Sequence, residues 1–250
     1  MKIKLGRVSK PVRGFSHVFH IVLLCLLPIV IFILVRLRFV EVAIGLILLS
    51  KWRMIAVKPR HWLANIRANA VDMIVGLSLL VFMIQASSVL AQSLWALGYI
   101  LWLVFIRPKS DVIGMTLQAL IAQFVGTMAI FVQFGGSSLY ILVAAGWLVA
   151  YMSARHFFAS FEEPLNRFVS NIWGYFAASL IWLLGHWLLF YGFIAQPTAL
   201  LSVIGFGLAS IYFLAKTDKL SHGIRRQIMF AMVGMLLVIL IFSDWGNKSI

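Results

Sequence analysis

Three side chains in one stretch of the sequence could carry acid–base chemistry. Glu162 and Glu163, in FEEPLNR (161–167), are the only adjacent carboxylates in a chain with seven acidic residues among 250. His186 follows 24 residues after Glu162. Carboxylates and imidazoles are the usual general acids and bases when an enzyme activates a water. The stretch therefore presents a choice between a catalytic site and the ordinary start of a helix.

The two motifs around these residues resemble those of an intramembrane enzyme family. Glu162-Glu163-x-x-x-Arg167 resembles the first motif of the CAAX-protease and bacteriocin-processing enzymes, and Trp182-x-x-x-His186 resembles the second, with Trp in place of the usual Phe. The resemblance implies an enzyme in which Glu162, Glu163 and His186 activate a water within the membrane. The family's later His-x-x-x-Asn/Asp motif has no counterpart after His186. A single helix through the stretch would hold Glu162 and His186 roughly 36 Å apart.

The same glutamates also fit the start of a helix. Ser160 and Glu163 have the spacing of a capping box, and Glu163 is followed by a proline, which favours the first helical position. Both patterns place negative charge where the helix dipole favours it, and Arg167 could form an ion pair with Glu163 one turn later. Asp72 and Asp111 stand at the predicted starts of two other helices, at 71 and 112.

Two predicted helices carry polar side chains at helical spacing. In 168–193 the spacing places five residues on one face, and in 112–134 two residues lie one turn apart. Such faces either line a cavity for a headgroup or small solute, or hydrogen-bond to neighbouring helices. The cavity candidates are Gln123, Thr127, Asn171, Tyr175, Ser179, Trp182 and His186.

The composition is that of a membrane protein. Hydrophobic residues make up 63% of the chain and charged residues 11%, and the mean hydropathy is +1.02. A bilayer core of about 30 Å needs about 20 apolar residues of helix. The sequence predicts an all-α transmembrane bundle that forms a single integral membrane domain over 1–250. The nine expected spans are 15–35, 39–56, 71–86, 89–106, 112–134, 138–153, 168–193, 198–215 and 227–243.

The basic residues predict the orientation of these spans. Nine crossings with a cytoplasmic N-terminus place 18 of the 21 Lys and Arg side chains inside, which the positive-inside rule favours. Residues 1–14 then form a basic cytoplasmic tail. The span at 39–56 is the weakest, because Lys51 follows Phe39 by only 12 residues. If this segment lies in the interface, the bundle has eight spans.

The connector at 51–70 mixes basic and aromatic residues, as segments at the cytoplasmic headgroup zone do. We expect it to contact anionic lipid headgroups, although docking of a cytoplasmic partner is the alternative. The net charge of +14 is assigned to this role and not to nucleic-acid binding. The expected headgroup contacts are Lys51, Arg53, Lys58, Arg60 and Arg67.

The expected function follows from a nearly uncharged interior. We expect a multi-pass protein of the cell (cytoplasmic) membrane that binds or transports an uncharged or lipid-like molecule, or that serves as the membrane subunit of a complex. The alternatives are the intramembrane enzyme described above and a membrane scaffold that assembles other subunits. The sequence places no carboxylate near the middle of a span, where ion-coupled transporters carry one. It also contains no HExxH or comparable motif, so no metal or cofactor is expected.

Overall fold

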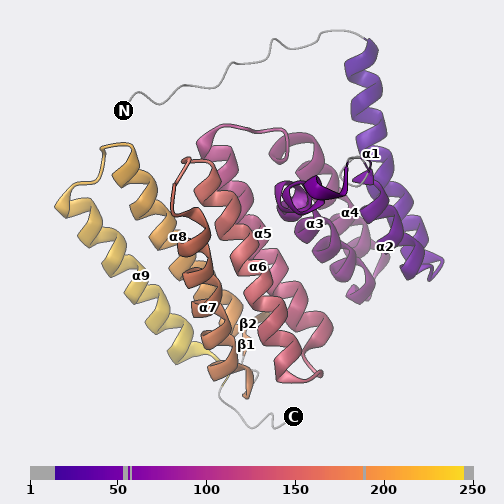
Figure 1. The fold of residues 1–250 in the computed structure, drawn as a ribbon. Helices are drawn as coiled ribbons and strands as arrows, with labels where there is room; N and C mark the ends of the chain where they lie inside the picture. The colour runs from indigo at the N-terminus through magenta and orange to yellow at the C-terminus, as the bar shows by residue number, and fades with distance from the viewer. Residues whose placement is uncertain (1–14, 53–55, 57, 188–189, 245–250) are drawn as a thin grey trace. The chain divides into compact units, whose positions relative to one another are not determined.

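The computed structural model describes residues 15–52, 56, 58–187 and 190–244 (Figure 1). This part of the chain is all-α, with 82% of residues in helix and nine α-helices. A π-helical segment, Trp102–Ile106, extends α4, and a 3-10 turn, Pro59–His61, precedes α3. The helices are α1 (Phe15–Arg36), α2 (Val40–Leu49), α3 (Trp62–Gln85), α4 (Val89–Leu101), α5 (Val112–Phe134), α6 (Leu139–Ala159), α7 (Asn166–Gly185), α8 (Gln196–Lys216) and α9 (His222–Phe242).

Seven of these helices are long and apolar enough to cross a membrane. They are α3 to α9, with α4 counted together with its π-helical extension to Ile106, and each has at least 18 residues of helix. A chain with this many such helices is a multi-pass membrane protein, as the composition predicts. In lipid only a helix or a closed barrel satisfies its backbone hydrogen bonds internally, which is why these apolar runs are helical.

Helices α2, α3, α6, α7 and α9 have a boundary at least five residues from the predicted one. Helix α6 continues to Ala159 instead of ending at 153, and α9 begins at His222 instead of 227. Helix α2 has ten residues, which is about 15 Å of helix and half of a bilayer core. Helix α3 begins at Trp62, before the predicted start at 71, because the polar residues of 62–70 continue the same helix. Helix α7 ends at Gly185 instead of continuing to 193.

A short β-hairpin explains the early end of α7. Strands β1 (Phe190–Tyr191) and β2 (Ile194–Ala195) pair antiparallel, with Phe190 opposite Ala195. Gly192 takes a φ of 62° at the first position of the two-residue loop, where a hairpin turn favours glycine. The hairpin leads directly into α8, which begins at Gln196.

The chain divides into two compact units, 1–118 and 119–250, with the boundary inside α5. In the first unit the core lies among α2, α3 and α4, where Ile47, Leu80, Met83 and Tyr99 are almost fully buried. The expectation of a single membrane domain over 1–250 stays a prediction.

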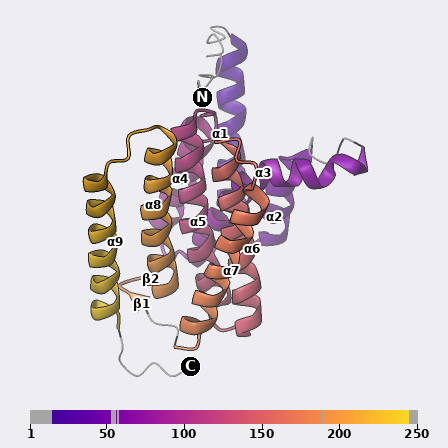
Figure 2. The ribbon, with the colours of Figure 1, turned by 60° about the vertical axis from the view of Figure 1, so that its left-hand side comes forward.

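In the second unit, α6 and α7 run side by side, and α9 lies against α8 (Figures 1 and 2). Glycines allow both approaches. A Cβ atom on Gly146 of α6 would lie 2.1 Å from Ile181 Cδ1 of α7, and one on Gly207 of α8 would lie 2.7 Å from Met232 Sδ of α9. Small residues of this kind bring helix backbones together in membranes, where packing has to replace the hydrophobic effect.

Candidate functional site

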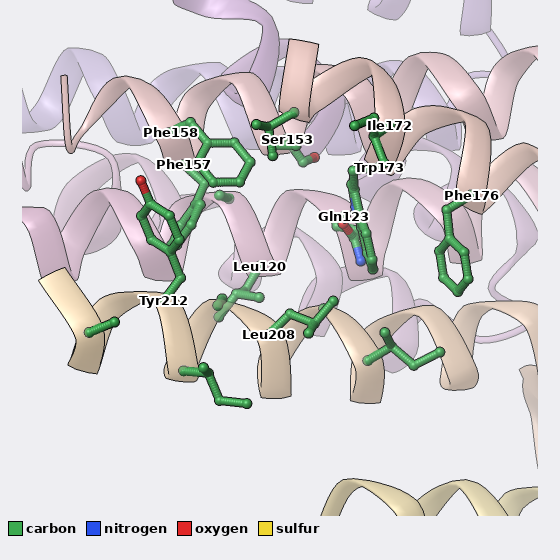
Figure 3. A pocket seen from close by; sticks show the side chains of 18 residues that line it. Leu120, Gln123, Ser153, Phe157, Phe158, Ile172, Trp173, Phe176, Leu208 and Tyr212 are labelled. Carbon is green, nitrogen blue, oxygen red and sulfur yellow. Dashed lines mark hydrogen bonds between the residues drawn. The ribbon is translucent and has the colours of Figure 1, made fainter. Parts of the chain in front are cut away.

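A cavity of about 670 Å³ lies within the second unit, between helices α5, α6, α7 and α8 (Figure 3). Its volume is in the range of small-molecule binding sites. The wall is formed by 18 residues, and none of them is charged. Apart from the ring groups of Trp173 and Tyr212, the polar side chains in the wall are Gln123 and Ser153.

The cavity opens sideways between α7 and α8. Ile172 of α7 and Leu208 of α8 both line it, yet they are 53% and 45% exposed. Figure 3 shows Ile172 and Phe176 on one side of the cavity and Leu208 across from them. The back wall is different, because Ala119 and Phe157 are buried there. In a bilayer the exposed side of these two helices faces acyl chains, so a molecule dissolved in the membrane has direct access to the cavity.

Aromatic rings close one end of the cavity. Tyr212 of α8 packs edge-on against Phe157, Phe158 and Phe161, with ring centroids 5.1–5.6 Å apart. Edge-to-face packing at this separation is the favourable arrangement for aromatic pairs. Leu180 and Leu184 of α7, which do not line the cavity, pack against the start of α8.

Beyond the aromatic end, Glu163 ties the α6–α7 turn to α8. The Tyr212 hydroxyl donates a hydrogen bond to Glu163 Oε2, and Lys216 Nζ lies 2.9 Å from the same oxygen. These bonds hold the pKa of the Glu163 carboxyl below its usual value, with the Tyr212 hydrogen bond as the largest cause and the Lys216 bond next. The Glu163 carboxylate and the Lys216 ammonium group are therefore paired with each other within the protein.

Gln123 fixes the middle of the cavity by joining three helices. Its Nε2 donates to Leu201 O of α8 at 3.0 Å, and its Oε1 accepts from Trp173 Nε1 of α7 at 2.7 Å. Gly205 provides room for this amide, since a Cβ atom there would lie 2.8 Å from Gln123 Nε2. The amide is thus satisfied by the protein and sets the spacing of α5, α7 and α8.

Ser153 is the other polar residue of the wall, and its hydroxyl has no partner. The residue is 1% exposed, and Oγ makes no hydrogen bond with any described residue. Figure 3 shows Ser153 between Phe158 and Trp173. Of the buried side-chain atoms without a partner in the described ranges, this is the one that lies in the cavity wall.

The glutamate pair terminates a helix instead of starting one, so the predicted capping box is wrong. Ser160 is the C-cap of α6, and its hydroxyl donates to Phe157 O. Glu162 takes a left-handed φ of 52°, and the Glu163 N–H donates to Phe158 O, which is the Schellman form of a helix end. Helix α7 begins only at Asn166.

The three catalytic candidates do not converge. Glu163 pairs with Lys216 and not with Arg167, its expected partner. Glu162 is exposed on the same turn. His186 is the exposed C-cap residue of α7, and its Nδ1 lies 2.8 Å from Trp182 O. Twenty residues of helix, about 30 Å, separate the glutamates from this histidine.

Of the predicted cavity residues, only Gln123 lines the cavity. Tyr175, Ser179, Trp182 and His186 are exposed on the face of α7 that points away from it. The Trp182 ring instead contacts the rings of Tyr140 and His186, with centroids 5.5 and 5.6 Å away.

The remaining two candidates bond to their own helices. Asn171 Nδ2 donates to Arg167 O at 2.9 Å, and Thr127 Oγ1 donates to Gln123 O at 2.7 Å. Thr127 is fully buried in the bundle without reaching the cavity. Local bonds of this kind remove the need for a polar side chain to face the protein interior.

Most of the wall is formed by residues that the sequence does not mark as cavity candidates. The α7 wall is Val169, Ile172, Trp173 and Phe176, an apolar stripe at helical spacing that resembles any lipid-facing surface. Trp173 is the residue from which the sequence could have indicated this wall. A buried indole N–H needs an acceptor, and Gln123, a predicted cavity residue, is that acceptor.

The first unit contains a second polar cluster, centred on Asp72. This residue lies in the interior of α3 and not at the start of a helix, as the sequence had suggested. Lys51 Nζ binds Asp72 Oδ2, Arg107 Nε lies 3.0 Å from the same oxygen, and Trp102 Nε1 donates to Oδ1 at 2.8 Å. The expectation of a carboxylate-free interior is therefore wrong for this helix.

This cluster also changes the expected role of Lys51. The residue is 6% exposed and bonds to Asp72, so its ammonium group is not available to a lipid headgroup. Lys58 and Arg60 are exposed as expected, and Arg67 is partly exposed, with its Nε bonded to Leu63 O. Arg53 lies outside the described residues.

Fold and site together define a class of protein: a multi-pass helical membrane protein with an uncharged cavity that opens on its side. Comparison of the chain with protein-family models, with curated proteins and with solved structures found no match in any of the three.

Proposed function

We propose that this protein binds a lipid-like, uncharged molecule that enters from the bilayer between α7 and α8. The observation that carries the proposal is the 670 Å³ cavity whose wall residues Ile172 and Leu208 are exposed at its side. A carrier or the membrane subunit of a complex could each use such a site. Binding is the step that they share.

The physics of the bilayer favours a site that binds a particular molecule over one that binds any apolar molecule. Lipid tails are as apolar as the cavity wall, so the hydrophobic effect does not drive a molecule from the membrane into the cavity. Affinity has to come from van der Waals fit and from hydrogen bonds. Aromatic side chains such as Phe157, Phe158 and Trp173 provide a rigid, shaped wall for this purpose.

The absence of charge from the described wall favours a neutral ligand over an ion. Ion-coupled transporters place acidic or basic side chains where the ion passes. Here Glu163 and Lys216 bind each other beyond the aromatic end, and neither lines the cavity. The separation of Glu163 from His186 likewise gives the enzyme alternative no support from the site.

A pair of substitutions on α6 tests the proposal. Ala154 is buried in the cavity wall, whereas Ala144 is exposed on the same helix and does not line the cavity. Ala154→Phe fills part of the cavity, and Ala144→Phe adds the same ring outside it. Both full-length variants are purified in mild detergent, and the lipid-like material that co-purifies is compared. We expect the Ala154→Phe protein to carry roughly one fifth or less of the amount that the Ala144→Phe protein carries. Mass spectrometry of organic extracts measures the difference.

Thermal unfolding of both variants provides the control for folding. Equal retention by two well-folded variants would contradict the proposal. If Ala154→Phe fails to fold, Ala209→Phe fills the cavity from α8 and replaces it in the comparison, because Ala209 also lines the wall.

We further propose the setting in which the site works. The protein resides in the cell membrane with a cytoplasmic N-terminus. This orientation is proposed because it places the largest excess of Lys and Arg residues on the cytoplasmic side. The connector rests on anionic headgroups through Lys58, Arg60 and Arg67, while the exposed Trp62 and Leu63 enter the acyl boundary.

A further inference from the structure

We propose that the cavity selects a neutral molecule with one oxygen acceptor, an uncharged ketone or alcohol of largely hydrocarbon character, and that the Ser153 hydroxyl donates a hydrogen bond to that oxygen. This inference rests on the proposed function and specifies the chemical class of the ligand. It is carried by the Ser153 hydroxyl, which among the described residues is the one buried, unpartnered hydroxyl in the cavity wall.

The hydroxyl of Ser153 is unusual for a serine within a helix. Helical serines usually donate to the carbonyl one turn earlier, as Ser78 does to Ile74 O at 2.7 Å and Ser202 does to Thr198 O at 2.7 Å. Ser153 makes no such bond, although it is as deeply buried as Ser78. An unmade hydrogen bond in an apolar place is costly, and a bound ligand oxygen would remove that cost.

The other polar groups around the cavity are already satisfied. Gln123 uses both ends of its amide, on Leu201 and Trp173. The Tyr212 hydroxyl is bonded to Glu163, whose charge is matched by Lys216. Among the described residues, the wall therefore offers a ligand one unpartnered hydroxyl and no unpaired charge. Such a wall has no partner for a phosphate, a carboxylate or an ammonium group.

The depth of Ser153 argues for the same class. It lies six residues before the end of α6, or about 9 Å of helix. A charged headgroup at that depth would have to leave water and find no partner in the wall, which is expensive. A carbonyl or hydroxyl group loses much less and regains a hydrogen bond from Ser153. The molecule thus enters oxygen end first, and its chain leaves past Ile172 and Leu208 toward the acyl region.

Three photoreactive probes of equal chain length test this inference on the full-length protein in lipid nanodiscs. Each is a diazirine-bearing alkyl chain, and they end in a methyl ketone, a plain methyl group and a trimethylammonium group. The measurement is the probe mole fraction that gives half-maximal labelling of peptides from α6 to α8. We expect the ketone to label at a mole fraction about 2- to 10-fold lower than the hydrocarbon, which is the range for one net hydrogen bond. The ammonium probe should label these peptides the least.

Serine-to-alanine variants assign the effect to one hydroxyl. Ser153→Ala should remove the preference for the ketone and leave hydrocarbon labelling unchanged, because only the hydrogen bond is lost. Ser78→Ala removes a buried helical hydroxyl from the first unit and should keep the full preference. A merely structural effect of Ser153→Ala would shift both probes equally.

The outcomes separate this inference from the proposed function. If the hydrocarbon and the ketone label equally in the unaltered protein, or if the preference survives Ser153→Ala, the inference fails while cavity binding stands. Stronger labelling by the ammonium probe would also overturn it. If Ala154→Phe leaves the labelling by every probe unchanged, the cavity is not the binding site and both proposals fail.

Discussion

At the scale of single residues, the two adjacent glutamates have different roles within one helix end. Glu162 adopts the left-handed conformation that ends α6, and Glu163 turns back to bind Tyr212 and Lys216 of α8. A carboxylate at the C-terminal end of a helix faces the negative end of the dipole. The bonds to Tyr212 and Lys216 offset this repulsion, which explains how the sequence tolerates acidic residues there.

The lowered pKa of Glu163 predicts a pH-dependent stability. Because the folded pKa lies below the ordinary value of 4.5, the ionised carboxylate stabilises the fold at neutral pH, and this contribution is lost as the pH falls through the lowered value. Glu163→Gln should lower the stability at pH 7 by about 1 kcal/mol, a modest amount because Lys216 is half-exposed. Thermal unfolding at neutral and at acidic pH measures this effect. The difference in melting temperature between Glu163→Gln and the unaltered protein should shrink as the pH falls.

The neighbouring glutamate provides the control for this prediction. Glu162→Gln changes the same charge on an exposed side chain of the same turn. It should have little effect on the melting temperature at either pH. An equal loss in both variants, or a gap for Glu163→Gln that is independent of pH, would contradict the assignment to the Tyr212 and Lys216 bonds.

At the scale of elements, Asp72 joins four segments of the first unit. It receives Lys51 from beyond the end of α2, Trp102 from the π-helical segment and Arg107 from the turn that follows it. The π-helical turn matters here because it changes the rotation of the helix between Trp102 and Arg107, both of which point to Asp72. One carboxylate in α3 thus fixes the positions of the ends of two other elements.

Removing this carboxylate should destabilise the first unit strongly. Asp72→Asn leaves Lys51 buried without a counter-charge, a change that costs about 3–5 kcal/mol in buried ion pairs. The double variant Lys51→Met/Asp72→Leu removes both charges and should recover most of that loss. Chemical or thermal unfolding in detergent compares both variants with the unaltered protein.

A second aspartate tests whether the effect belongs to the cluster. Asp111 caps the start of α5 by accepting from the Gly114 N–H at 3.2 Å, and asparagine caps helices equally well. Asp111→Asn should therefore change the stability by only about 0.5 kcal/mol or less. If Asp72→Asn is as mild as this control, or the double variant is no more stable than Asp72→Asn, the cluster is not a buried ion pair in the membrane environment.

At the scale of the whole molecule, the short helix α2 decides how the N-terminal part of the chain is threaded. Its ten residues are half the length that a bilayer core requires. Lys51, two residues beyond the end of α2, is nevertheless buried and paired with Asp72, so the chain packs against α3 beyond the end of the helix. We therefore keep the proposal that this segment completes a crossing with the help of α3.

Single cysteines at Leu37 and Lys58 test this threading in intact cells. They flank α2, and both positions are exposed. With a cytoplasmic N-terminus and a crossing at α2, a membrane-impermeant maleimide should label Leu37→Cys from outside and label Lys58→Cys only after the cells are opened. The native Cys25 is replaced by alanine beforehand. Labelling of both positions from the same side would show that α2 does not cross.

The sequence by itself determined the class of the protein and the approximate position of its helices. A run of about 20 apolar residues has one stable form in lipid, because only a helix satisfies its own backbone there. Helices α4, α5 and α8 accordingly lie within a few residues of their predicted spans. The boundaries that failed, at α2, α3, α6, α7 and α9, are those at which polar or hairpin-forming residues adjoin the apolar run.

Only the tertiary structure decided which side of each helix faces the protein. In water a polar stripe must face out, but in a bilayer both the lipid and the protein neighbours of a helix are apolar, so the contrast that orients a helix is weak. Asn171 satisfies its polar group within α7 and needs no interior position, while Trp173 on the same helix is drawn inward by Gln123. The cavity and the open hydroxyl of Ser153 arise from four helices meeting in this way, which spacing along one helix does not encode.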